Sequence, residues 1–462
     1  MTVQQGTLGI AQAGRARPAQ SRLAGLVGWR LSDQAVQGVV TAAVMIVAAR
    51  ALGPSRLGEL SFVLAIGAML TPIVTTHNQV IVHDLVAEPD ARRSILGASL
   101  VYGLVLATLL FAALVVVAVV AVDERTTRIA LILGATTLPC IALSIGEGAL
   151  QADSLGREIA IARGGSSVIG AGLKLAVIAI GGGVAGFVLA GTAQAIVTSF
   201  ALFLFARSRV NDAFPLRVDW SRVRQLARRS LPLALSALSI SVYMLLDQVV
   251  LGFMADDAEL GRYAAAVRIA MAPVVLPMVV MTSATPGLAA LRTESHELYI
   301  AQLQRLINFL GLLGVLIGGS LAIAAPILIR VVYGRPYSHA ANVLSIVAIA
   351  DIFVFLSVAT GVWFVFEGRQ TSYMTRAIIG ALINVALLLV LIPRYGGHGA
   401  AWAALAAYCY VALFGNFLDK RTQPVFWMVL RSLTPRSLVS TFRRDLVGQV
   451  RARFSHTTGA QP

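Results

Sequence analysis

Residues Ser94–Val122 read SILGASLVYGLVLATLLFAALVVVAVVAV and contain no Asp, Glu, Lys or Arg. A helix needs about 20 mostly apolar residues to cross a bilayer core of roughly 30 Å. A charge-free apolar stretch of this length therefore predicts a membrane-spanning helix. Three further stretches share both properties: Leu60–His83, Leu306–Ile329 and Tyr395–Leu418.

The composition of the whole chain agrees with a membrane protein. Of the 462 residues, 57% are apolar and 13% are charged, against about 45–50% and about 25% in ordinary soluble domains. The mean hydropathy is +0.80. These values exclude a soluble domain, a disordered chain, a disulfide-built secreted domain and a nucleic-acid-binding domain. The net charge of +15 is read first as a topology signal.

The hydropathy pattern predicts an all-α polytopic membrane protein. The stretch Leu175–Ala206 is too long for one helix, and Gly181-Gly182-Gly183 is expected to split it. We predict twelve spanning helices, near residues 30–50, 58–82, 95–122, 129–151, 163–180, 186–206, 231–254, 262–288, 304–330, 341–366, 373–393 and 399–419.

The distribution of Lys and Arg predicts the orientation. With the N-terminus in the cytoplasm, 27 of the 37 basic residues fall on the cytoplasmic side, eight fall outside, and two lie within spans. Such an excess favours cytoplasmic termini. The predicted organisation is a cytoplasmic N-tail (1–28), a six-helix bundle (29–206), a basic linker (207–229), a second six-helix bundle (230–419) and a basic C-tail (420–462).

The two predicted bundles show weak internal similarity at an offset of roughly 200–215 residues. Gly156-Arg157, with Arg163 and Gly170 after it, corresponds to Gly368-Arg369, with Arg376 and Gly380 after it. Because each half has an even number of helices, both halves enter the membrane from the same face. The pattern is typical of transporters that place a binding site between two parallel repeats.

Polar side chains recur on single faces of several predicted helices, at spacings of three and four residues. Such faces are expected to meet water or protein rather than lipid. Interhelical hydrogen bonding, without any role in transport, explains the same pattern. The candidate cavity-lining residues are Gln34, Gln37, Thr41, Thr75, Asn78, Ser239 and Tyr243.

Cations inside predicted spans are the strongest signal. Lys174 and Arg268 lie within helices, and Arg30 lies near the start of the first one. A cation at mid-helix costs roughly 2.5–3.5 kcal/mol on insertion scales, so some interaction must offset this cost. One interpretation is pairing with an acid such as Glu147, or snorkelling to the headgroups. The other is a wet cavity in which these cations bind an anionic group.

Acidic residues in the spans have two interpretations as well. Asp33, Asp247 and Asp351 are candidates for a coupling site that takes Na+ or H+. Asp247 is equally well explained as an internal counter-ion to Arg268. We find no P-loop, no metal-type cysteine or histidine spacing and no serine nucleophile elbow. The sequence therefore predicts no cofactor, no metal site and no enzyme.

The C-tail has a pattern of its own. Leu438, Phe442, Leu446 and Val450 recur every four residues among several arginines. This predicts a basic amphipathic helix on the anionic inner leaflet, with docking of a partner as the second interpretation.

Three segments together resemble polysaccharide-biosynthesis flippases of the Wzx type, in the multidrug/oligosaccharidyl-lipid/polysaccharide (MOP) superfamily. They are Arg50-Ala51-Leu52-Gly53-Pro54-Ser55-Arg56-Leu57-Gly58-Glu59-Leu60-Ser61, the segment with Asp247 and Glu259-Leu260-Gly261-Arg262-Tyr263-Ala264, and Ile392-Pro393-Arg394-Tyr395-Gly396-Gly397-His398-Gly399. The resemblance covers about residues 29–420. The chain differs from the related lipid II flippases in two respects. It has twelve predicted helices where they have fourteen, and its C-tail is longer and more basic.

The resemblance implies two bundles in a V that opens alternately to each side of a bacterial inner membrane. It implies transport of a polyprenyl-diphosphate-linked saccharide, with Arg30 and Arg268 in helices comparable to those that carry diphosphate-binding arginines in lipid II flippases. Glycosyltransferases or a polymerase of the same pathway are candidate partners. The alternatives are a cation-coupled multidrug exporter of the same superfamily and a non-transporting scaffold for cell-wall or polysaccharide enzymes.

Overall fold

The computed structural model describes residues 4–210 and 214–434, with side chains from Gln37 onward. Every regular element in this part is a helix, and no strand occurs among the described residues. The helices are α1 (Gln4–Thr75), α2 (His77–Ala87), α3 (Arg92–Ala121), α4 (Arg125–Ala135), α5 (Thr137–Ala142), α6 (Gly146–Ala152), α7 (Gly156–Ala179), α8 (Gly183–Arg209), α9 (Trp220–Met254), α10 (Asp257–Met271), α11 (Val275–Glu294), α12 (His296–Val332), α13 (Ala340–Phe366), α14 (Gln370–Cys409), α15 (Gly415–Leu418) and α16 (Gln423–Ser432). The predicted all-α class is confirmed.

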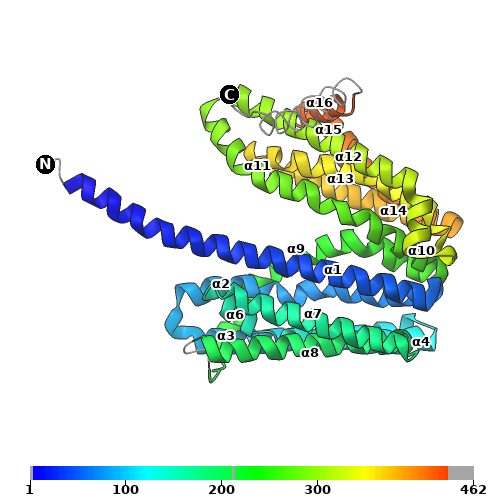
Figure 1. Ribbon diagram of the computed structural model, residues 1–462, viewed down its shortest axis with the longest axis horizontal. Helices are drawn as coiled ribbons and strands as arrows, with labels where there is room; N and C mark the ends of the chain where they lie inside the picture. Colours follow the sequence, from blue (N-terminus) through cyan, green and yellow to red (C-terminus); the bar gives the residue numbers. More distant parts are fainter. Residues whose placement is uncertain (1–3, 211–213, 435–462) are drawn as a thin grey trace, which may run out of the picture. The chain divides into compact units, whose positions relative to one another are not determined.

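Ten ranges of the described chain are long and apolar enough to span a membrane. Two of them, Gln37–Ala87 with 51 residues and Gln370–Leu418 with 49 residues, far exceed the length that one crossing requires. Each is broken by a glycine with positive φ, Gly53 (76°) and Gly396 (53°), a conformation that side chains with a Cβ rarely adopt. In Figure 1 the chain of α1 doubles back before it reaches α2. The count of ten does not itself confirm twelve crossings, although each long range contains two of the predicted helices.

Other predicted helices are also interrupted. The predicted helix 129–151 consists of α4, α5 and α6, and the predicted helix 262–288 consists of α10 and α11 with a 3-10 turn, Ala272–Val274, between them. Pro273 lies in this turn and cannot donate a backbone hydrogen bond, which explains the break. The division between α7 and α8 falls at Gly181–Gly183, as predicted. The first helix begins at Gln4, well before the predicted start near residue 30.

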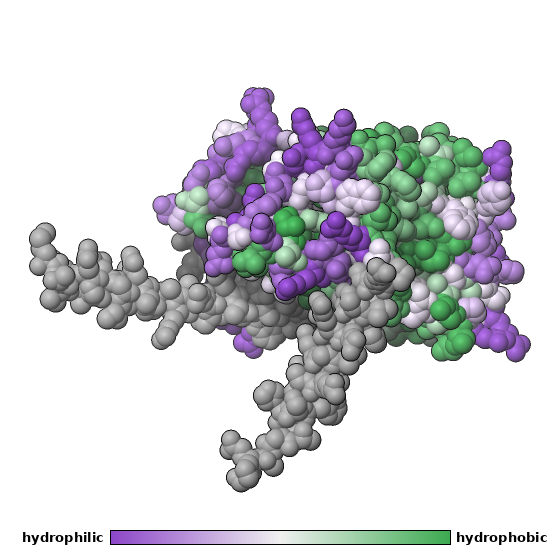
Figure 2. Space-filling model, turned by 90° about the horizontal axis from the view of Figure 1, so that it is seen from above, coloured by the Kyte–Doolittle hydropathy of each residue, from purple (hydrophilic) through white to green (hydrophobic). Residues whose placement is uncertain are grey.

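The chain forms two compact units, residues 1–245 and 246–462, so that the division falls inside α9. In the first unit, α1, α7 and α8 run side by side (Figure 1). In the second unit, α12 packs along α13, and α13 packs against α10 and α14. On the face seen in Figure 2, hydrophobic residues gather in a broad area with hydrophilic residues on either side. Such an apolar surface suits contact with lipid.

The start of the predicted C-tail belongs to the second unit. Val425, Met428 and Val429 of α16 are buried in a core cluster with residues of α12 and α13. The amide of Gln304 on α12 donates to the backbone carbonyl of Met428 at 3.0 Å. The predicted amphipathic segment with Leu438, Phe442, Leu446 and Val450 lies outside the described residues.

The close packing of α12 on α13 depends on small residues. A Cβ at Gly318 would lie 2.5 Å from the backbone oxygen of Ala348, whereas a Cβ at Gly319 would meet no atom within 4 Å. Small residues allow helix backbones to approach each other in this way within membranes.

We expect Gly318→Ala to destabilise the protein by about 1–3 kcal/mol, because the added methyl group must push the two backbones apart. Gly319→Ala, one position along the same helix, is the matched control and should leave the stability unchanged or slightly raised. Thermal unfolding in detergent measures both variants. Equal melting temperatures for the two would contradict the close approach.

Candidate functional site

Lys174 on α7 lies in a small polar cavity of the first unit. Its Nζ donates to Oε1 of Gln194 on α8 at 2.8 Å and lies 5.7 Å from the centre of the Phe187 ring. The cavity, of about 30 Å³, is also lined by Thr41 and Ser167. Two of the predicted residues, Lys174 and Thr41, are therefore brought together.

No acid neutralises Lys174 within the described part of the chain. Its hydrogen-bond acceptor, Gln194, is a neutral amide. Glu147, one of the carboxylates considered as its partner, binds Arg163 instead, with both oxygens at 2.7 Å from Nη2. Lys174 therefore has a neutral hydrogen-bond acceptor, and its ammonium form would interact strongly with a ligand of opposite sign in this partly buried cavity.

Asp247 and Asp351 gather around a tyrosine in the second unit. The Tyr263 hydroxyl of α10 donates to Asp247 of α9, and the side chain of Tyr263 is only 1% exposed. Asp351 of α13 lies near enough to Tyr263 to interact with it electrostatically. We refer to Asp247, Tyr263 and Asp351 as the acid–tyrosine cluster.

The hydrogen bonds of Asp247 are local. Its carboxylate accepts from the Tyr263 hydroxyl and from the backbone N–H of Gln248, and both interpretations of Asp247 stay predictions. Asp351 is 7% exposed, and its Oδ2 has no hydrogen-bond partner among the described residues. A buried carboxylate without a partner is costly, so Asp351 lowers the stability of the fold.

Arg268, on α10, lies beside two tyrosines at the end of α12. Tyr333 and Tyr337 are close enough to interact electrostatically with its guanidinium, and their ring centres are 5.4 Å apart. Burial raises the pKa of both phenols, so they remain neutral at physiological pH. Arg268 belongs to the second unit and Lys174 to the first, and the convergence of the two on one chamber stays a prediction.

The other predicted cavity-lining residues are less informative about a cavity. Thr75 and Ser239 donate to backbone carbonyls one turn earlier in their own helices, at 3.2 and 2.9 Å. This is the ordinary way in which a hydroxyl is satisfied inside a helix, and it neither requires nor excludes a cavity. Gln37, Asn78 and Tyr243 are half-buried. The side chains of Arg30, Asp33 and Gln34 lie outside the described residues.

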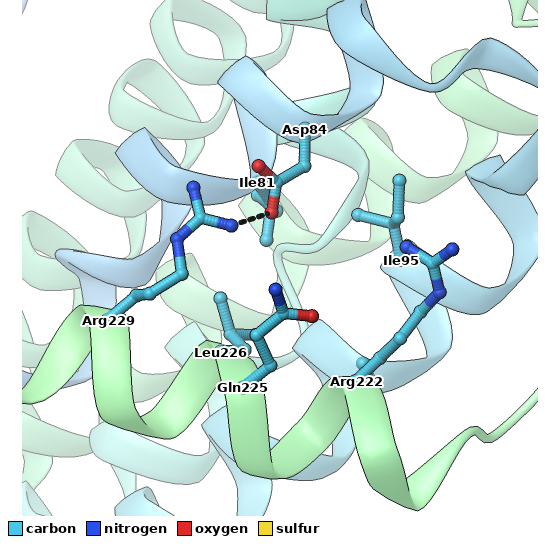
Figure 3. Close-up of a pocket in the computed structure, with 8 residues that line it drawn as sticks. Ile81, Asp84, Ile95, Arg222, Gln225, Leu226 and Arg229 are labelled. Atoms are coloured by element: carbon cyan, nitrogen blue, oxygen red, sulfur yellow. Dashed lines mark hydrogen bonds and ion pairs between the residues drawn. The ribbon is translucent and has the colours of Figure 1, made fainter.

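The linker 207–229 contributes ion pairs that the sequence did not predict. Arg229 binds Asp84 at 2.8 Å and Arg222 binds Glu88 at 2.9 Å, which fastens the start of α9 to α2. Figure 3 shows Arg229 pointing at Asp84 across a pocket that Gln225 and Leu226 also line.

Asp219 lies beside the N-terminus of α9, where negative charge is favourable. Hydrogen bonds from the Ser221 side chain and backbone lower the pKa of Asp219, which keeps its carboxylate ionised.

We expect Asp351→Asn to raise the stability of the protein by about 1–3 kcal/mol, because it removes a buried charge that lacks a partner. Asp153→Asn is the control, since Arg92 binds that carboxylate with two hydrogen bonds and its loss should lower the stability. Thermal unfolding in detergent at pH 8 measures both. A loss of stability in Asp351→Asn as large as that of the control would show that Asp351 is a structural residue.

The fold agrees with that of known transporters. An inward-facing multidrug resistance transporter of the MATE family in the MOP superfamily superposes with a TM-score of 0.65, at 16% identity, over 86% of this chain and 96% of that one. The lipid II flippase MurJ, in an inward closed conformation, gives a TM-score of 0.68 at 14% identity, over 91% and 93% of the two chains. The chain thus shares the fold of these two membrane proteins.

The sequence narrows this class to a family. Residues 27–292 match the family of polysaccharide biosynthesis proteins, and the chain belongs to this family. A putative O-antigen transporter of Shigella dysenteriae is 24% identical over 184 residues, which are 40% of this chain and 46% of that protein. The chain thus aligns with less than half the length of this curated relative. The resemblance stated from the sequence is confirmed at the level of the polysaccharide biosynthesis family.

Several residues of the site could not be found from the sequence. Gln194, the partner of Lys174, lies twenty residues further on in the next helix, and Tyr263 was visible only as part of a family motif. Gly170 gives one indirect signal, because a Cβ there would lie 2.2 Å from Oε1 of Gln194. The glycine therefore leaves room for the amide beside Lys174.

Proposed function

We propose that this protein is an alternating-access flippase. It moves a polyprenyl-diphosphate-linked oligosaccharide, or another cell-envelope polysaccharide precursor, across the bacterial inner membrane, with both termini in the cytoplasm. Membership of the polysaccharide biosynthesis family and the fold shared with MATE transporters and a lipid II flippase support this proposal.

The observation that carries the proposal is the environment of Lys174. A cation inside an apolar helix is expensive to bury, yet its acceptor is the neutral amide of Gln194. A lysine with a purely structural role would be better satisfied by a carboxylate. A diphosphate carries negative charge that such a cation can bind, and Gln194 would hold the ammonium group in position until the ligand arrives.

The same chemistry extends to the other predicted cations. Arg268 and Arg30 would add planar guanidinium groups that bind two phosphate oxygens at once. Tyr333 and Tyr337, beside Arg268, would offer neutral hydroxyl groups and aromatic faces to the saccharide. The exposed Thr41 and Ser239 would add further hydroxyl groups for sugar contacts.

Lys174→Ala should reduce the flipping rate about tenfold or more, because a hydrogen bond to a charged group contributes about 1.5–3 kcal/mol. The assay uses proteoliposomes with a fluorescent polyprenyl-diphosphate saccharide and an impermeant quencher. Lys420→Ala is the matched control, since Lys420 is the other lysine of the chain and is exposed. Equal rates for Lys174→Ala and Lys420→Ala would refute the proposed role of Lys174.

The acid–tyrosine cluster would couple transport to an ion. Asp351 is buried, with an oxygen that has no hydrogen-bond partner among the described residues, and Asp247 accepts a hydrogen bond from Tyr263. Two carboxylates near one phenol can accept a proton or, with the hydroxyl oxygen, bind Na+. The bound ion would remove the cost of the buried charge and so favour one conformation over the other.

We expect wild-type flipping to accelerate when a pH or Na+ gradient is imposed across the proteoliposome membrane. Asp351→Asn and Tyr263→Phe should abolish or weaken this acceleration while flipping without a gradient persists. Asp123→Asn, in the segment between α3 and α4, is the control. A gradient response that is identical in Asp351→Asn and wild type would exclude the cluster as the coupling site.

A multidrug exporter is the second function that the fold permits, and the acid–tyrosine cluster would suit a cationic substrate. Lys174 disfavours it, because a cation in the cavity repels such substrates. Uptake of a cationic dye into the same proteoliposomes tests this function directly.

A role as a non-transporting scaffold would require neither the cations nor the acids within the predicted spans. Glycosyltransferases or a polymerase of the pathway, and anionic lipids at the C-tail, remain proposed partners.

A further inference from the structure

Arg376 on α14 is a buried arginine that the proposed transport mechanism does not use. Its side chain is 4% exposed. Nη1 donates to Oδ1 of Asn416, and the guanidinium carbon lies 4.3 Å from the ring centre of Phe364 and 5.3 Å from that of Tyr373. Nε and Nη2 have no hydrogen-bond partner among the described residues.

The two unpartnered nitrogens lie on one edge of the guanidinium. This edge presents two parallel N–H groups, which match two oxygens of a phosphate or carboxylate. Leaving them buried without acceptors costs free energy, and the faces of the aromatic rings offset only part of this cost. The arrangement therefore suits a ligand that supplies the missing oxygens.

A cavity of about 320 Å³ lies next to Arg376. Its lining is rich in hydroxyl groups, from Thr371, Ser372, Thr375, Tyr410 and Thr422. Hydroxyl groups donate well to phosphate oxygens and add no charge.

The one carboxylate that lines the cavity, Asp419, is already engaged. Its Oδ2 accepts from Ser372 at 3.2 Å, and its Oδ1 accepts from the backbone N–H of Arg421 at 2.9 Å. Among the described residues it forms no ion pair with Arg376, whose guanidinium is the cation that lines the cavity.

The local backbone makes room for the arginine. A Cβ at Gly415 would lie 2.6 Å from Cγ and 2.8 Å from Cδ of Arg376. A π-helical turn, Tyr410–Phe414, comes directly before this glycine, and such turns occur often at functional sites. The missing Cβ at Gly415 thus leaves room for the Arg376 stem. An oxyanion in the cavity would reach the unpartnered edge once the guanidinium turns away from the rings.

The corresponding arginine of the first unit is different. Arg163 matches Arg376 in the predicted repeat, and it forms a salt bridge with Glu147 at 2.7 Å. No carboxylate takes this place beside Arg376 among the described residues. One repeat therefore contains an internal ion pair where the other has a cation next to a cavity.

The sequence around the cavity has the composition of a membrane interface. It lies between the first turn of α14 and the end of α15, which the basic-residue count predicts to be cytoplasmic. Leu418 on its rim is 71% exposed, Trp427 nearby in the sequence is 51% exposed, and Lys420 and Arg421 follow. Exposed apolar and aromatic groups next to basic residues are typical of the membrane interface.

We propose that Arg376 and the surrounding hydroxyl groups form a phosphate-binding site in the second unit, separate from the proposed transport cavity. The phosphate belongs either to an anionic phospholipid headgroup or to free inorganic phosphate. The site does not depend on the proposed transport function.

Binding of two probes to the full-length protein in detergent tests the site. Native mass spectrometry gives the affinity for dioleoylphosphatidylglycerol, and thermal unfolding gives the affinity for inorganic phosphate. Arg376→Gln should weaken the binding of at least one probe about tenfold or more, because the bidentate contact is lost. Arg421→Gln, which removes the same charge from an exposed residue two positions after Asp419, should weaken it less than twofold.

The two binding measurements together identify the source of the phosphate. Loss confined to phosphatidylglycerol shows a lipid site, and loss confined to inorganic phosphate shows a site for the free ion. Equal affinities in Arg376→Gln and Arg421→Gln, or no binding of either probe to wild type, would overturn the proposal. If Arg376→Gln does not fold, Arg376→Lys is measured instead, because lysine keeps the charge but cannot form the bidentate contact. Binding that is at least fivefold weaker supports the site, and unchanged binding refutes it.

Discussion

The cost of placing a charge in an apolar helix is the constraint on which the rest of this structure depends. The two units meet it differently. In the first unit, Glu147 and Arg163 form an ion pair, while Lys174 is satisfied by the neutral amide of Gln194. In the second unit, Asp247 accepts a hydrogen bond from the hydroxyl of Tyr263, and Arg376 is satisfied only in part, by Asn416 and aromatic rings. Neutral partners leave the charge available to a ligand, whereas an ion pair cancels it.

Interrupted helices are the second common feature. Gly53 and Gly396 reverse or bend the chain within long helical runs, and Pro273 lies in the break between α10 and α11. Arg268 lies one turn before that break, so its guanidinium is carried by a helix end rather than by the middle of a rigid rod. Breaks of this kind place charged side chains at the ends of helix segments.

Many of the candidate site residues could be chosen from the sequence, because charged residues are costly and therefore rare in membrane-spanning stretches. Lys174, Arg268, Asp247 and Asp351 stand out in apolar stretches, and each lies in a helical range that is long and apolar enough to span a membrane. Their partners were not predictable. Gln194 and Tyr263 come from neighbouring helices, and nothing in their local sequence distinguishes them from other polar residues. Arg376 was counted among the cytoplasmic basic residues, because the sequence does not show that Phe364, Tyr373 and Asn416 bury it.

The sequence by itself determined the class of this protein: a multi-pass α-helical membrane protein of the polysaccharide biosynthesis family, with cations and acids inside its spans. Hydropathy and charge act on each residue separately, so a linear pattern suffices for this conclusion. Only the tertiary structure decided which charges are neutralised and which are not. Partnership depends on which helices lie side by side and on where a glycine, such as Gly170 or Gly415, leaves room for a neighbouring side chain.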